Sequence, residues 1–265
     1  LLGRETPQPQ SYSPEILQPI PRAGNRKLLG LDEQLPFHGA DTWHAYELSW
    51  LDGEGKPVVL TGIFTVPASS PNIVESKSFK LYLNSLNNEQ LETSERAVAT
   101  IETDVDTAAG APVTLAIHAP DDPAMAGAPL PGKCLDHLSL ATVAPAPDRA
   151  LLGVIDAEPV EEQLYTHLMR SLCPVTAQPD WASVWLHYRG APIDHVALLS
   201  YIVAYRSHQE FHEQCVERLF MDVLHQCEPE FLHVQAFYTR RGGMDISPYR
   251  STDPEARSLP RLDRQ

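Results

Sequence analysis

The chain has 265 residues, 43% of them hydrophobic, which is enough for one large domain or two modest ones of ordinary globular composition. Its formal net charge of −15 argues against a nucleic-acid-binding surface, because such a chain repels phosphate backbones. The apolar runs are far shorter than a membrane span, and no charged-then-apolar leader opens the chain. We therefore expect a cytoplasmic protein with no membrane partner and no direct nucleic-acid partner.

The first half of the chain predicts an irregular arm followed by a mixed set of elements. Residues 1–35 are rich in proline and polar residues, which is typical of irregular structure. The turn Asp52-Gly53-Glu54-Gly55 separates two runs that favour strands. In chain order, periodicity predicts strands over 43–51 and 58–66, helices near 76–87 and 93–108, and a strand over 113–119.

The second half repeats this order of elements. It predicts strands over 162–170 and 181–188, helices over 194–206 and 209–226, and a strand over 231–238. Residues 121–160 are rich in Pro, Ala and Gly and predict a linker with some extra strand material. Two copies of the same pattern indicate a tandem duplication, and the expected fold class is α+β, with antiparallel sheets and a helix pair on one face of each. Exposed sheet edges favour a homo-oligomer.

The segment Glu75-Ser76-Lys77 opens the first predicted helix. Phe79 and Leu83 recur at helical spacing behind it, and Ser76 is the expected N-cap. Amide donors and the positive end of the helix dipole beside Lys77 suit an anionic ligand such as a phosphate. Glu75, one residue outside the helix, would then be available to accept N–H donors from a ligand.

Cys173 and Asp180 flank a loop that contains two prolines. A loop of that length can fold back so that the carboxylate meets the sulfur, and such a pair can move a proton between a thiol and a substrate. The alternative is a buried structural cysteine with a capping aspartate, and the pair alone does not decide between them. We expect free thiols rather than disulfides, because the four cysteines form no close pair in this long chain.

The helix predicted over 209–226 contains three residues at metal-helix spacing. His208 and His212 lie four residues apart and Cys215 three further on, so zinc is conceivable. No H-E-x-x-H sequence accompanies them, and Cys215 shares the apolar face of the helix, so we expect no metal site. His212 and Glu213 either line a pocket or lie on a solvated helix face.

Arg240 and Arg241 precede two glycines after a predicted strand. Guanidinium and backbone N–H donors in such a segment can wrap one phosphate group. An exposed charged turn is the alternative, and by itself the segment favours that alternative.

Together these segments resemble the 7-cyano-7-deazaguanine reductase (QueF) family in its long, two-module form, over nearly the whole chain. The motifs that carry the resemblance are Leu35-Pro36-Phe37-His38-Gly39, Tyr46-Glu47-Leu48-Ser49-Trp50-Leu51, Glu75-Ser76-Lys77-Ser78, Gln178-Pro179-Asp180-Trp181, Phe211-His212-Glu213-Gln214-Cys215-Val216-Glu217-Arg218 and Tyr238-Thr239-Arg240-Arg241-Gly242-Gly243. The resemblance implies tandem tunnelling-fold (T-fold) modules at 36–120 and 161–265, and a homodimer.

The resemblance also implies an activity and its residues. Members reduce the nitrile of 7-cyano-7-deazaguanine to a primary amine with two NADPH, in queuosine biosynthesis. The implied catalytic residues are Cys173, which adds to the nitrile as a thioimide, Asp180 and His212. The implied substrate-binding residues are Val74, Glu75, Ser76, Phe211, His212 and Glu213, and the implied NADPH-binding residues are Ser76, Lys77, Arg240, Arg241 and Gly242.

Three rival functions are compatible with parts of the sequence. A GTP cyclohydrolase-like enzyme of the same fold would need zinc and a second nearby ligand beside Cys173. A nitrile hydrolase would use a Cys, a Glu and a Lys without NADPH. A non-catalytic purine-binding module would keep Glu75 and Glu213 and have no use for Cys173 or Asp180.

Overall fold

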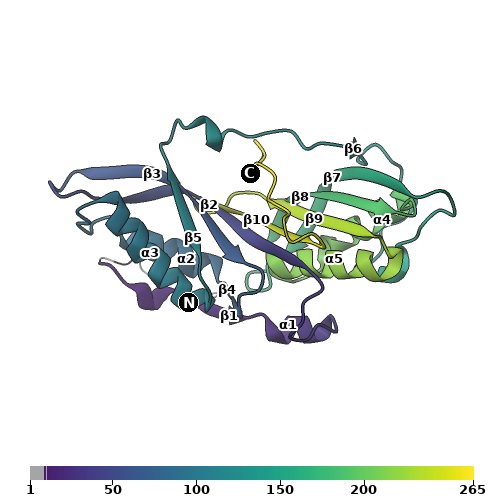
Figure 1. The fold of residues 1–265 in the computed structure, drawn as a ribbon, viewed down its shortest axis with the longest axis horizontal. Coiled ribbons are helices and arrows are strands. Elements are labelled where there is room, and N and C mark those ends of the chain that lie inside the picture. The colour runs from purple at the N-terminus through teal and green to yellow at the C-terminus, as the bar shows by residue number, and fades with distance from the viewer. Residues whose placement is uncertain (1–8, 10) are drawn as a thin grey trace. The chain divides into compact units, whose positions relative to one another are not determined.

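The computed structural model describes residue 9 and residues 11–265, which divide into two compact units (Figure 1). Within this part of the chain, unit 1 comprises the residues up to Gly30, Ala40–Ala126 and Arg240–Ile246, and unit 2 comprises Leu31–Gly39, Gly127–Thr239 and Ser247–Gln265. The units are therefore not the continuous segments that we expected from the sequence. In particular, the arginine–glycine segment, Arg240-Arg241-Gly242-Gly243, lies in unit 1 and not in a second module that runs to the C-terminus.

Unit 1 contains an antiparallel sheet in the order β5-β3-β2, and a separate antiparallel pair of β1 and β4. Helix α3 packs against β5 and β4. The elements in this region are η1 (Pro14–Ile16), β1 (Pro19–Pro21), α1 (Ala23–Leu28), β2 (His38–Leu51), β3 (Pro57–Pro67), β4 (Asn72–Val74), α2 (Ser76–Ser85), α3 (Ser94–Ala109), β5 (Thr114–His118) and η2 (Pro123–Met125).

Unit 2 contains strands in the order β10-β9-β8-β7-β6, with β10 contributing its residues from Ser247 onward, and the pairs are antiparallel except for β6–β7. Helix α4 packs against β7 and α5 against β9, and α5 lies along one face of these strands (Figure 1). The elements are β6 (Lys133–Cys134), η3 (Arg149–Leu151), β7 (Val160–Leu172), β8 (Pro179–Gly190), α4 (His195–Val203), η4 (Ala204–Ser207), α5 (His212–Cys227), β9 (Phe231–Tyr238) and β10 (Met244–Ser251).

The repeat of strand, strand, helix, helix and strand is confirmed at the level of these elements. The first long strand of each set also has a register shift, between Ala45 and Leu48 in β2 and between Thr166 and Met169 in β7. The irregular arm expected over 1–35 is wrong over 14–28, where η1, β1 and α1 form, and its first eight residues and residue 10 lie outside the described residues. Proline limits helices and central strands, but it is compatible with a short strand that pairs on one side only.

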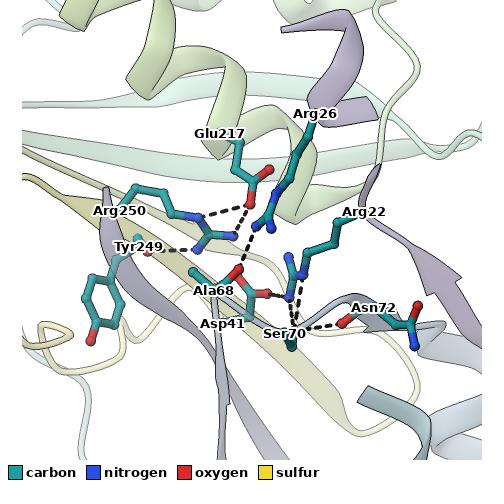
Figure 2. A network of polar contacts seen from close by, with 9 residues as sticks. All are labelled: Arg22, Arg26, Asp41, Ala68, Ser70, Asn72, Glu217, Tyr249 and Arg250. Carbon is teal, nitrogen blue, oxygen red and sulfur yellow. Dashed lines mark hydrogen bonds and ion pairs between the residues drawn. The ribbon is translucent and has the colours of Figure 1, made fainter. Parts of the chain in front are cut away.

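Each unit contains a buried arginine–carboxylate pair (Figure 2). In unit 1, Arg22 donates to Asp41 at 2.5 Å and to Ser70, and these two charged side chains are 3% and 1% exposed. In unit 2, Arg250 donates to Glu217 at 2.9 Å, with 0% and 2% of their side chains exposed. Removing one partner of such a pair leaves a buried charge without its counterion, so both pairs fix the strands and helices that carry them.

In the described part of the chain, no helix combines the length and the hydropathy that a membrane crossing needs.

Candidate active site

The start of helix α2 is organised by the carboxylate of Glu75. Its Oε1 accepts the N–H of Lys77 at 3.0 Å and its Oε2 accepts the N–H of Ser78 at 2.7 Å, which makes Glu75 the N-cap. Our prediction of Ser76 as the N-cap is therefore wrong by one residue. The side chain of Glu75 is long enough to reach two of the amides that a helix start leaves without partners.

This arrangement changes what the segment can bind. Two amides that we expected to face an anionic ligand are occupied by Glu75 itself, while Ser76 and Lys77 are exposed. A carboxylate has about four lone-pair positions, so a Glu75 that accepts two amides retains the capacity to accept N–H groups of a base. Glu75 and the preceding Val74 are 4% and 3% exposed, so any such contact is made in a largely desolvated place.

Cys173 begins the loop between β7 and β8, and its thiol is free and half-buried. Its N–H donates to the carbonyl of Gln178 at 2.9 Å, and its own carbonyl accepts the N–H of Ala177 at 2.9 Å. Ala177 has a φ of 55°, a left-handed conformation that is uncommon for a residue with a Cβ. The loop is thus a closed, hydrogen-bonded structure that holds the thiol at the end of a strand.

Asp180 lies on the same face of the β7–β8 pair as Cys173. Ser171 pairs with Asp180 in register, and the backbone bond from Cys173 to Gln178 continues the ladder beyond it. Alternate side chains share a face, and diagonal neighbours in such a pair lie about 7–8 Å apart. The predicted contact between the two groups stays a prediction.

Asp180 is 4% exposed and lies against the imidazole of His212 from helix α5. Asp180 Oδ2 is 3.2 Å from His212 Nε2. A face of the imidazole stacks on the ring of Tyr238, with ring centroids 3.9 Å apart and planes 20° apart. The carboxylate and the aromatic ring together fix the position of His212. Sequence reasoning missed Tyr238, because as the last residue of a strand it is indistinguishable from a core aromatic.

The other predicted residues of this helix lie at its N-terminus. Phe211 is half-buried and its N–H donates to the Gln214 side chain at 3.2 Å, whereas Glu213 is 4% exposed. Just before them, Glu210 accepts from Arg218 Nε at 3.0 Å. The sequence analysis did not predict this ion pair between Glu210 and Arg218, which we call the brace, because the two residues lie eight positions apart.

Glu210 also has His208 beside it, with Nε2 2.7 Å from a Glu210 carboxylate oxygen. Burial acts to raise the pKa of Glu210, but the hydrogen bonds from Arg218 and His208 outweigh it, and the pKa is lowered. His208 and His212 thus face different carboxylates. Cys215 is fully buried, and burial raises the pKa of its thiol. Among the residues that the structure describes, no group of three or more His, Cys, Asp or Glu is placed to hold a metal ion.

The arginine–glycine segment forms a tight hairpin turn. Arg241 and Met244 pair through N–H···O bonds of 2.8 and 3.1 Å, and the two residues between them, Gly242 and Gly243, have φ of 56° and 80°. Two successive left-handed residues define a type I′ turn, which glycine adopts without strain. Arg240 and Arg241 are exposed beside this turn.

A small pocket in unit 1 adjoins the turn, lined by Ala45, Glu47, Lys80, Leu83, Asn84, Gly242, Gly243 and Met244. A Cβ added to Gly242 would lie 2.7 Å from the Lys80 side chain, and one added to Gly243 would lie 2.5 Å from that of Glu47. The backbone therefore approaches these side chains as closely as glycine permits. Guanidinium, ammonium and glycine N–H groups are donors of the kind that bind the phosphates of a cofactor.

The predicted site residues divide between the two units. Unit 1 contains Val74, Glu75, Ser76, Lys77, Arg240, Arg241 and Gly242, and unit 2 contains Cys173, Asp180, Phe211, His212 and Glu213. Unit 1 thus contains Glu75 and the cationic side chains, and unit 2 contains the Cys173 thiol, Asp180 and His212.

Two family models match this chain, one described as "Nitrile reductase, 7-cyano-7-deazaguanine-reductase N-term" over residues 8–117 and one as "QueF-like protein" over residues 179–257. The chain is 50% identical over 266 residues to the NADPH-dependent 7-cyano-7-deazaguanine reductase of Chromohalobacter salexigens, covering 100% of this chain and 96% of that protein. Proteins of the same name from Dechloromonas aromatica and Coxiella burnetii are each 51% identical, covering 95% and 96% of this chain and 89% and 91% of their own lengths. 

A solved structure of the archaeosine synthase QueF-Like in the apo form aligns with 39% of this chain and 100% of its own, at 18% identity and a TM-score of 0.32.

Proposed function

The chain belongs to the NADPH-dependent 7-cyano-7-deazaguanine reductase family, and we propose that it converts 7-cyano-7-deazaguanine to 7-aminomethyl-7-deazaguanine with two NADPH, in queuosine biosynthesis. It is an oxidoreductase. The observation that carries this function most directly is the group of Cys173, Asp180 and His212 in unit 2, because a nitrile reductase needs a nucleophile with an acid beside it.

The thiol performs the first step. A nitrile carbon is a weak electrophile, so Cys173 adds its sulfur to that carbon, and the thiol proton goes to the nitrile nitrogen by way of Asp180. The product is a covalent thioimide, which accepts a hydride more readily than the nitrile does. The closed loop that holds Cys173 keeps the sulfur at the end of β7 during this addition.

Asp180 and His212 transfer the protons that the two reductions require. Each of the two reductions adds a proton as well as a hydride, and the carbon–sulfur bond breaks between them to release an imine and restore the thiol. The contacts of the His212 imidazole with Asp180 and Tyr238 support a role in which it orients the imine and assists its protonation. The intermediate must stay enclosed, because water would hydrolyse it to an aldehyde.

The deazaguanine base is recognised by acceptors and a ring. Its ring N–H and exocyclic amine are donors, and each unit offers a carboxylate of matching chemistry, Glu75 in unit 1 and Glu213 in unit 2. Both carboxylates are 4% exposed, so their hydrogen bonds form away from water and select strongly for a partner with donors. Beside Glu213 in unit 2, Phe211 offers a ring that could stack on the base, and beside Glu75 in unit 1, Val74 and Ser76 offer further contacts.

NADPH, when bound, supplies the hydrides. The residues present fit its phosphates: Ser76 and Lys77 are exposed at the start of α2, and Arg240, Arg241 and Gly242 lie at the type I′ turn. All five lie in unit 1. A Rossmann crevice would instead need a G-x-G-x-x-G turn after a strand, which this sequence lacks.

The repeated element order supports a finer description of the fold as two tandem T-fold modules. A homodimer would cover the sheet edges that such modules leave exposed. Four free cysteines suit the reducing conditions of the cytoplasm, where the tRNA modification pathway would use the product.

The test is NADPH oxidation followed at 340 nm with 7-cyano-7-deazaguanine, for the wild type and for Cys173→Ala. We expect two NADPH consumed per amine formed, no oxidation in Cys173→Ala, and a covalent adduct on Cys173 in mass spectra taken without NADPH. Cys134→Ala, a second half-buried thiol, is the matched control and should keep full activity. Base binding without NADPH oxidation in the wild type would instead favour a purine-binding module, and nitrile hydrolysis without NADPH would favour a hydrolase.

A further inference from the structure

Strand β2 contains a bulge next to the arginine–glycine turn. The register of β2 on β3 shifts between Ala45 and Leu48, so two residues of β2, Tyr46 and Glu47, oppose a single residue of β3. Such bulges redirect side chains and are frequent beside functional sites. The N–H of Tyr46 donates to the carbonyl of Gly243 at 2.9 Å, so the bulge is joined directly to the turn.

The hydroxyl of Tyr46 is bound by a buried carboxylate. It donates to Asp245 Oδ2 at 2.5 Å, while Asp245 Oδ1 lies 2.7 Å from His44 Nδ1. Asp245 is 2% and His44 6% exposed. Because both carboxylate oxygens are engaged by groups of β2, the Tyr46 ring has little freedom to rotate or to tilt.

The guanidinium of Arg240 stacks on the ring of Tyr46. The central carbon of the guanidinium lies 3.8 Å from the ring centroid, which is the separation of direct stacking. Stacking uses the face of a guanidinium, whereas a phosphate is bound by its edge, so the two contacts are compatible. An exposed arginine that is already stacked loses less side-chain freedom when it binds an anion.

We propose that Tyr46 is a positioning residue that holds Arg240 for the 2′-phosphate of NADPH, and thereby sets the preference for NADPH over NADH. This inference rests on the proposed function. The 2′-phosphate is the group by which NADPH differs from NADH, and it lies far from the transferred hydride. Tyr46 therefore affects cofactor affinity through Arg240 and does not take part in hydride transfer. Asp245 and His44 support the ring and do not contact the cofactor.

The primary experiment is calorimetric titration of the full chain with NADP⁺ and with NAD⁺, in the absence of turnover. Tyr46→Leu removes the ring, and we expect it to weaken NADP⁺ binding by about three- to thirtyfold, the range of a stacked cation, and to change NAD⁺ binding less than twofold. Tyr46→Phe retains the ring and loses the bond to Asp245, so its loss of NADP⁺ affinity should be smaller. In steady-state kinetics, Tyr46→Leu should raise the KM for NADPH and leave kcat unchanged.

A double-mutant cycle separates positioning from a merely structural role. If Tyr46 acts through Arg240, Tyr46→Leu has no further effect on NADP⁺ affinity in an Arg240→Ala background. Tyr12→Phe is the matched control for Tyr46→Phe, because Tyr12 also donates its hydroxyl to an aspartate, Asp104, at 2.6 Å. It should bind NADP⁺ like the wild type.

Three results would overturn the inference. They are unchanged NADP⁺ affinity in a folded Tyr46→Leu, an equal loss for NADP⁺ and NAD⁺, and additive effects of the Tyr46 and Arg240 changes. If Tyr46→Leu does not fold, Tyr46→Phe in the same cycle still decides the question. Failure of the proposed function looks different, because the wild type itself would then neither bind NADP⁺ nor oxidise NADPH with the nitrile.

Discussion

The imidazole of His212 lies nearly flat on the ring of Tyr238, with ring centroids 3.9 Å apart. The Tyr238 side chain is 1% exposed, so the imidazole rests on a surface that belongs to the core of unit 2. The same imidazole lies 3.2 Å from Asp180, so one residue of the proposed catalytic group is fixed from two directions. Core packing and the proposed proton transfer therefore involve the same side chain.

Replacing Tyr238 should impair turnover more than binding. We expect Tyr238→Leu to lower kcat by about tenfold and to change the dissociation constant of the base less than twofold, because a shifted imidazole no longer delivers its proton along the right line. Tyr238→Phe keeps the stacking and should retain most of the activity. Steady-state kinetics with a pH profile of kcat checks this, and an unchanged kcat and pH profile in a folded Tyr238→Leu would rule out the positioning role.

The brace between Glu210 and Arg218 should be sensitive to acid. The pKa of Glu210 is lowered in the fold, so its contribution to stability is present above the ordinary glutamate pKa of about 4.3 and is lost as the pH falls through the lowered value. Glu210→Gln should cost about 1–3 kcal/mol of unfolding free energy at pH 7, and this difference from the wild type should shrink below pH 4.

Urea unfolding of the wild type and of Glu210→Gln at pH 7 and at pH 3 provides the measurement. Glu255→Gln is the control, since Glu255 pairs with Arg257 at 3.4 Å with 82% and 73% of their side chains exposed and should matter little at any pH. A Glu210→Gln penalty that stays constant from pH 7 to pH 3 would show that the brace does not depend on its charge.

Sequence patterns predicted the elements that have strong periodicity. The two long strands of each repeat and the helix pairs that follow them were expected within a few residues of their observed limits. Strand β10 was not expected, because Asp245, Ser247 and Pro248 interrupt its apolar pattern. All of its residues are buried nonetheless, since neighbouring polar groups such as His44 and Gln265 satisfy them.

The candidate site was predictable in its residue types and less so in its local geometry. The helix start was assigned to Ser76, because short polar side chains are the usual N-caps, whereas Glu75 occupies that position. The partners that support the site, Tyr238 and Tyr46, lie on strands and look like ordinary core aromatics in the sequence. The proposed roles depend on contacts with residues far away in the sequence, His212 of helix α5 for Tyr238 and Arg240 for Tyr46, which a single sequence does not encode in its spacing.

Thiol reactivity should follow burial. Cys173 and Cys134 are half-buried, while Cys215 and Cys227 are buried, and burial raises the pKa of Cys227 to about 11. Since the thiolate is the reactive form, iodoacetamide at pH 7.5 should modify the first two cysteines before the others, and the substrate should protect Cys173 alone. Peptide mass spectrometry after timed labelling checks the order. Labelling of Cys215 before Cys173 in the folded protein would contradict this assignment of the nucleophile.

His233 should make unit 2 less stable in mild acid. It lies between the rings of Trp185 and Tyr249, at centroid distances of 5.2 and 5.4 Å, and burial lowers its pKa to about 4. In the unfolded chain it gains a proton near pH 6.5, whereas in the fold it stays neutral. Its stabilising contribution is therefore complete above pH 6.5 and is lost progressively as the pH falls to 4, by at most about 3 kcal/mol.

The variant that isolates this effect is His233→Gln, which carries no titratable group. The wild type should lose unfolding free energy between pH 7 and pH 4, and His233→Gln should lose less over the same interval, even if it is less stable at pH 7. His225→Gln, at an exposed position of helix α5, should follow the wild-type curve. Parallel pH curves for the wild type and His233→Gln would mean that His233 takes up its proton in the folded protein as readily as in the unfolded chain.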